Sequence, residues 1–165
     1  MAIRNSRFEL TTGVFASAST GAVGYSGGAA QAEEFAQPSL GGQIDAWGKA
    51  SGTLAASGTA TIDLTALTGP DGSTVTLTAV VAGYVQITST TAGGKLAVGN
   101  AASNANQLGF GNANDTWTIR ANGPGLAFGD PEGTGITVDS SHRNVKVENT
   151  SGVSVDWVAY FGGAT

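Results

Sequence analysis

The segment from Asn144 to Phe161 alternates apolar and polar residues over two short runs. The first run alternates Val145 and Val147 with charged residues. In the second run every other position is apolar: Val153, Val155, Trp157, Ala159 and Phe161. A period of two over runs this short is typical of half-buried strands. Because only Asn149 to Gly152 separate the runs, the pattern predicts a tight hairpin, with Asn149 and Gly152 tolerating the unusual backbone angles of its turn.

The same alternation continues from Thr53 onward, and turn signals such as the segment 69–73 interrupt it about every ten residues. Roughly eight to ten strands and no helix of useful length are expected. This spacing predicts an all-β fold with a single β-sandwich, for which an eight-stranded jelly roll is the preferred form. The inner faces are expected to hold Ile62, Leu64, Val75, Leu77, Ile87, Leu96, Val98, Trp117, Ile119, Val145, Val147, Val155 and Trp157.

Residues 1–50 differ in composition from residues 51–165, which are predicted to form the jelly-roll-like β-sandwich domain. The first fifty residues are expected to be an extended, Gly/Ala/Ser-rich N-terminal arm and linker, in which Phe8 to Leu10 could form a short strand and Glu33 to Ala36 a helical turn. Between Thr11 and Ala32 there is no charged residue. Such a stretch buries too little apolar surface to offset about 1–2 kcal/mol of backbone ordering per residue.

A neighbouring chain is therefore expected to order this arm; the alternative is that the arm packs back on its own domain. Contact with a partner chain is expected from the large apolar residues of the arm and of the entry to the domain: Phe8, Leu10, Val14, Phe15, Tyr25, Phe35 and Trp47.

Charge and cysteine content exclude several classes of function. The net charge is −5 and only seven residues are basic, which argues against binding to nucleic acid through its phosphates. With no cysteine, neither a disulfide framework nor a thiolate metal site can form. No apolar run has the length of a signal peptide or a membrane span, so the sequence predicts a soluble protein that does not bind a membrane.

Residues that could carry catalysis are few. His142 is the only histidine and follows Asp139, Ser140 and Ser141. Residues this close on one turn do not normally reach the geometry of a hydrolase triad, so a turn histidine is the better interpretation. A glycosidase needs two carboxyl groups about 5–10 Å apart, and nothing in the sequence places two of the four candidate acids at that distance, so they are expected to be surface turn acids: Asp130, Glu132, Asp139 and Asp156. The sequence therefore predicts that the protein is not an enzyme.

No cofactor or metal site is expected either. Asn112, Asn114 and Asp115 offer oxygen ligands at alternate positions, but the acidic loop with its glycine and distal glutamate is missing. The glycine-rich turns lack the lysine and helix start of a phosphate-binding loop. Of the three tryptophans, Trp117 and Trp157 are in phase with inward-facing neighbours and are predicted core residues, whereas Trp47 is a candidate anchor for another chain.

The segment from Lys95 to Phe161 resembles head decoration (cement) proteins of tailed bacteriophages, which have a β-sandwich or jelly-roll fold. The resemblance rests on these motifs: Leu96-Ala-Val-Gly-Asn100 with its Asn-rich loop, Asp115-Thr-Trp-Thr-Ile119, Gly123-Pro124, Phe128-Gly-Asp-Pro131, Gly135-Ile-Thr-Val-Asp139, Val145-Lys-Val-Glu-Asn149 and a closing strand that ends in Gly-Gly. They cover about two fifths of the chain.

The resemblance implies a virion protein on the outer surface of the capsid that bridges neighbouring major capsid protein subunits and stabilises the shell. It also implies copies of itself as partners, in a dimer or a trimer. Two alternatives stay open: a phage tail or fibre module that binds host surface glycan, and a small polysaccharide-degrading enzyme that uses Asp130 or Glu132.

Overall fold

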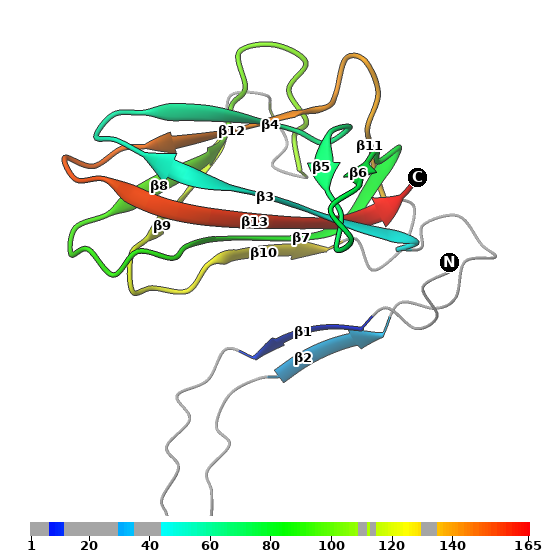
Figure 1. Ribbon diagram of the computed structural model, residues 1–165, viewed down its shortest axis with the longest axis horizontal. Coiled ribbons are helices and arrows are strands. Elements are labelled where there is room, and N and C mark those ends of the chain that lie inside the picture. Colours follow the sequence, from blue (N-terminus) through cyan, green and yellow to red (C-terminus); the bar gives the residue numbers. More distant parts are fainter. Residues whose placement is uncertain (1–6, 12–29, 35–43, 109–111, 113–114, 130–134) are drawn as a thin grey trace, which may run out of the picture.

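The computed structural model describes residues 7–11, 30–34, 44–108, 112, 115–129 and 135–165, and these residues contain strands and no helix (Figure 1). Residues 44–165 form two antiparallel sheets that pack face to face, which confirms the predicted all-β sandwich. The larger sheet has the order β10 (Leu126–Gly129), β7 (Ala79–Ile87), β13 (Val155–Ala164), β3 (Ala46–Leu54), β5 (Leu67–Thr68) and β6 (Thr74–Val75), with β11 (Ile136–Thr137) also beside β7. The smaller sheet has the order β4 (Thr59–Asp63), β12 (Asn144–Asn149), β8 (Lys95–Gly99) and β9 (Thr116–Arg120).

The eight longer strands of the sandwich have the connectivity of a jelly roll. Numbered along the chain from β3 to β13, without the two-residue strands, they give one sheet in the order six, three, eight, one. The other sheet has the order two, seven, four, five. The strand pairs therefore alternate between the sheets as two Greek keys require, and the eight-stranded jelly roll expected from the turn spacing is confirmed.

The predicted hairpin between residues 144 and 161 is wrong. Strand β12 pairs with β4 and β8 in the smaller sheet, and β13 pairs with β3 and β7 in the larger one. The connection from Thr150 to Ser154 therefore crosses from one sheet to the other, and neither Asn149 nor Gly152 has a positive φ. Alternation showed that each strand has an apolar face, but an apolar face does not reveal which strand lies beside it.

The core between the sheets contains nearly all of the residues predicted for it. The buried ones are Ile62, Leu64, Leu77, Leu96, Val98, Ile119, Val145, Val147, Val155 and Trp157. Val75 and Ile87 are half-buried and pack against this cluster. Trp117 is the exception, because 56% of its surface is exposed. It lies on the same face of β9 as Ile119, but β9 is the edge strand of its sheet. At an edge, a side chain on the core-facing side can remain exposed because the opposite sheet does not extend over it.

Two short strands lie in the arm, where β1 (Arg7–Thr11) pairs antiparallel with β2 (Ala30–Glu34). The expected strand at Phe8 to Leu10 is confirmed, whereas the helical turn expected from Glu33 is wrong, because Glu33 and Glu34 extend β2 opposite Phe8 and Arg7. The ladder supplies backbone hydrogen bonds that a single helical turn could not match. Strand β3 begins at Ala46, so the larger sheet includes residues 46–50, which the sequence analysis had assigned to the linker.

Candidate functional site

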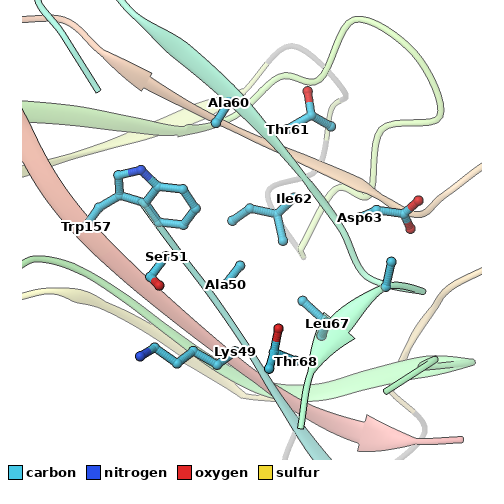
Figure 2. A pocket seen from close by; sticks show the side chains of 11 residues that line it. Lys49, Ala50, Ser51, Ala60, Thr61, Ile62, Asp63, Leu67, Thr68 and Trp157 are labelled. Carbon is cyan, nitrogen blue, oxygen red and sulfur yellow. The ribbon is translucent and has the colours of Figure 1, made fainter. Parts of the chain in front are cut away.

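A groove opens between the two sheets at the edge formed by β3 and β4 (Figure 2). Its volume is about 530 Å³, within the range of ligand sites in proteins. The chain turns at one end of the groove, where Gly58 N donates to Ala55 O at 2.9 Å. Residues 66–68 line its other end. We call this feature the β3/β4 groove; its lining is Lys49, Ala50, Ser51, Ala60, Thr61, Ile62, Asp63, Ala66, Leu67, Thr68 and Trp157.

The groove exists because both bordering strands have an unpaired side. Strand β4 is the outermost strand of the smaller sheet and pairs only with β12. Strand β3 pairs with β13 along its whole length, but on its other side it meets β5 only at Lys49 and Thr68. Within the described part of the chain, residues 50–54 and 59–63 therefore leave backbone N–H and C=O groups without a strand partner.

Small residues on the inner face of β3 leave room for Leu67 and Trp157, which line the groove together with Ala50. The inner face of β3 carries Gly48, Ala50 and Gly52, as its pairing with the core-facing residues of β13 shows. Trp157 lies across the floor and is 5% exposed (Figure 2). Its indole nitrogen, Nε1, is buried and has no hydrogen-bond partner among the described residues. A buried N–H without an acceptor costs about 1–3 kcal/mol, which the packing of the ring must offset.

Charged groups stand at only one end of the groove, where Lys49 and Asp63 line it. The Asp63 carboxylate accepts hydrogen bonds from Thr65 Oγ1 at 2.6 Å and from Thr65 N at 2.9 Å, and Arg143 Nε lies 3.7 Å from its Oδ2. Burial raises the pKa of Asp63, but the bonds from Thr65 and the charge of Arg143 outweigh it, so the pKa lies below its ordinary value. Asp63 is therefore an anion that supports its own turn and is not poised for proton transfer.

Replacing Asp63 with asparagine should make the free energy of unfolding depend less on pH in the acid range. A pKa lowered in the folded state means that the carboxylate stabilises the fold above about pH 4 and that this contribution disappears as the pH falls through the folded pKa. Urea unfolding should find Asp63→Asn less stable than the parent at pH 7, by less than about 1 kcal/mol because the site is partly exposed. The difference should vanish near pH 2. A difference that does not change with pH would contradict this assignment.

The residues predicted to contact a partner fall into three groups. Trp47 is half-buried on the outer face of the larger sheet, where its ring covers Gly162. Phe8 and Leu10 belong to β1. The remaining four lie outside the described residues: Val14, Phe15, Tyr25 and Phe35. The structure thus places Trp47 on the body of the domain, and the sequence did not single out the lining of the groove.

Around His142 the structure has a turn and not a catalytic triad. The imidazole Nδ1 lies 3.0 Å from Asp139 Oδ1, which also accepts a hydrogen bond from Ser141 N at 2.7 Å. Among the described residues, no serine hydroxyl bonds to the imidazole. The bond from Ser141 N, followed by the contact with His142, lowers the pKa of Asp139. The same Asx turn recurs at four other places, where a side-chain oxygen accepts from the residue two positions on: Asp63, Asp71, Asn106 and Asn149.

The carboxylates considered for glycoside hydrolysis do not form a pair in the described residues. Asp139 follows β11, which pairs with the first residues of β7, whereas Asp156 lies just beyond the last residue of β7 and accepts a bond from Thr88 N. The nine residues of β7 separate the two acids by roughly 27 Å, far more than the 5–10 Å that the reaction needs. Asp130 and Glu132 lie outside the described residues.

Of the three residues weighed for calcium, Asn114 lies outside the described residues. Asn112 N donates to Asp115 Oδ2 at 3.2 Å and closes a turn. No group of three or more histidine or acidic side chains that could hold a metal ion occurs in the residues for which the structure gives positions. In the same residues no helix is long and apolar enough to cross a membrane.

A second, smaller hollow lies on the outer face of the larger sheet and shares Lys49 and Thr68 with the groove. Its volume is about 280 Å³, and Trp47, Tyr160 and Pro70 contribute to its walls. Tyr160 is 40% exposed. We call it the aromatic hollow.

Comparisons of the chain with protein-family models, with curated proteins and with solved structures found no match.

Proposed function

We propose that this protein is a decoration protein of a tailed bacteriophage, which binds the outer surface of the head and bridges neighbouring major capsid protein subunits. The jelly-roll fold is common among viral capsid domains, although lectins and enzymes share it, so the fold alone does not decide the function. The motifs between Lys95 and Phe161 support the proposal, as does an acidic chain that avoids the packaged DNA. The role is structural and involves no catalysis.

The observation that carries the proposal is the position of the aromatic hollow. Trp47 lies three residues after Ile44, the first described residue after β2, and forms a wall of the hollow together with Tyr160. Tryptophan and tyrosine dominate the binding energy of many protein interfaces. The domain therefore offers an aromatic contact surface close in the sequence to the point where the arm joins it. The arm and this surface can engage the same partner.

The mechanism that we propose is multivalent clamping. An arm of about forty residues reaches on the order of 100 Å when it is extended, enough to contact a subunit next to the one that the hollow binds. Each contact needs only modest affinity, because linkage makes the second binding event intramolecular. Binding to the assembled shell and not to its dissociated subunits then stabilises the shell by mass action.

Deleting residues 2–40 should abolish binding to heads and leave the domain folded. The assay uses stripped heads of the phage that encodes the protein and measures bound protein and the temperature at which the heads release DNA. The parent should raise that temperature and the deletion variant should not, although both should unfold at nearly the same temperature in isolation, because the deletion spares the two packed sheets. Tyr160→Ala should weaken binding, whereas Thr118→Ala, at an exposed site on β9, should not. Heads that are equally stable with and without the protein would refute the proposal.

A second function, a tail or fibre module that binds host surface glycan, is favoured by the same hollow, since an exposed aromatic ring offers a flat apolar face to a sugar. A glycan array tests it with the full chain and with Tyr160→Ala. Binding that is lost in the variant, together with absence of binding to heads, would reassign the protein to this function.

A further inference from the structure

The outer edge of β4 is open along its whole length. All five residues from Thr59 to Asp63 pair with β12 on one side, and no described residue pairs with the other side. Proteins commonly protect such an edge with lysine, proline or a bulge. Strand β4 contains neither lysine nor proline, and its register with β12 is continuous. The edge is therefore suited to accept a further strand about 17 Å long.

The groove beside this edge has space for the inward side chains of an added strand only if they are small. Its walls include Ala50 and Ala60, and Trp157 lies at the floor with its N–H unpaired (Figure 2). A strand laid along β4 would cover the mouth of the groove and the part of the Trp157 ring that lines it. The groove is uncharged except at the end with Lys49 and Asp63.

The chain itself contains a segment of matching chemistry. Residues 14–19 read Val-Phe-Ala-Ser-Ala-Ser, with small apolar residues at alternate positions: Val14, Ala16 and Ala18. The segment carries no charge, and its six residues match the length of the open edge. One face of such a strand would enter the groove while Phe15, Ser17 and Ser19 faced outward.

The hairpin of the arm favours insertion into another copy. Strand β2 ends at Glu34, the end that leads to the domain at Ile44, while Thr11 pairs with Ala30 at the opposite end. The five-pair ladder therefore holds Thr11 and Ala30, between which residues 14–19 lie in the sequence, about 14 Å from Glu34. We propose that residues 14–19 of a second copy add to β4 as a strand and cover the β3/β4 groove, and that reciprocal insertion joins two copies about a twofold axis.

Disulfide trapping in the full chain tests this, because the protein has no cysteine of its own. One variant carries Ser17→Cys and an affinity tag, and a second carries Thr61→Cys at the exposed middle of β4. The matched control is Thr118→Cys, an exposed threonine on β9, the outer strand at the other side of the same sheet. After mild oxidation, the pair Ser17→Cys and Thr61→Cys should give about tenfold more mixed dimer than the pair with Thr118→Cys, because docking raises the effective concentration of the thiols.

A signal from inside the groove gives an independent readout. The NMR resonance of the Trp157 indole N–H should move as the concentration of the parent chain rises, since the added strand changes the surroundings of the ring that lines the groove. Equal yields of mixed dimer at Thr61 and Thr118 would overturn the inference. So would a chain that carries both Ser17→Cys and Thr61→Cys and closes on itself, while the mixed single variants give no dimer.

The inference and the proposed function fail separately. Trapping at Thr61 by a protein that does not bind heads would keep the strand exchange and reject the decoration role. Binding to heads by a protein that shows no trapping would keep the decoration role and reject the strand exchange.

Discussion

Replacing Asn149 with alanine is expected to lower the free energy of unfolding by about 3 kcal/mol. The side chain is completely buried. Its amide nitrogen donates to three carbonyl oxygens: Leu54 at 3.1 Å, Ala55 at 2.8 Å and Val153 at 2.7 Å. Its oxygen accepts from Ser151 N at 3.0 Å and Ser151 Oγ at 2.6 Å. Alanine would leave several of these buried groups unsatisfied, each at a cost of about 1–3 kcal/mol, which partial entry of water would reduce.

The position of Asn149 explains why a single amide has so large an effect. Its hydrogen bonds join the turn that follows β3 to the connection between β12 and β13. Strand β12 belongs to the smaller sheet, whereas β3 and β13 belong to the larger one. Loss of the amide should therefore loosen one whole end of the sandwich, which hydrogen exchange at residues 54–58 and 150–154 would report.

Urea unfolding of the Asn149→Ala variant measures the effect, with Asn144→Ala as the control. Asn144 occupies the other end of β12, is half-buried and donates to a single carbonyl, Ser103 O at 3.0 Å. Its loss should cost about 1 kcal/mol or less. Equal destabilisation of the two variants would show that the buried network at Asn149 contributes no more than an ordinary surface bond.

Sequence periodicity identified the buried face of a strand more reliably than the strands that pair with it. The alternation through Trp157 and Phe161 correctly predicted which side of β13 is buried, because a side chain's face depends only on its position along the strand. The same alternation led to a wrong hairpin, because pairing depends on contacts between residues of β13 and residues seventy or more positions earlier in the chain. Trp117 was misplaced for a related reason, since coverage by the opposite sheet is not a property of β9 alone.

The β3/β4 groove could not have been located from the sequence by the signals that reveal catalytic sites. It is formed mainly by small residues and by two strand edges, neither of which stands out in a list of reactive side chains. One weak signal was present: Gly48, Ala50 and Gly52 occupy the inward positions of a central strand, where large apolar residues are the rule. Small residues at three successive inward positions indicate that larger side chains from neighbouring segments fill the space, and here Leu67 packs over Gly48 and Trp157 over Gly52.

Replacing Phe161 with alanine is expected to destabilise the protein by about 4 kcal/mol, the largest effect of any single truncation on β13. The ring is fully buried near the centre of the larger sheet, opposite Gly48 on β3 and Gly83 on β7. It also packs against Phe128, with ring centroids 6.1 Å apart and the planes tilted by 50°. The glycines on both neighbouring strands are covered by Leu67 and Phe128, and partial relaxation of these two side chains should reduce but not close the cavity that alanine would leave.

Two substitutions on the same strand separate this cavity effect from a general weakening of β13. Tyr160→Ala truncates the preceding residue, which points outward and is 40% exposed, and should cost about 1 kcal/mol. Phe161→Leu keeps most of the buried volume and should cost about half as much as alanine. If thermal and urea unfolding ranked Tyr160→Ala equal to Phe161→Ala, the glycine-flanked ring would not be the centre of the core, because only a buried side chain leaves a cavity when it is removed.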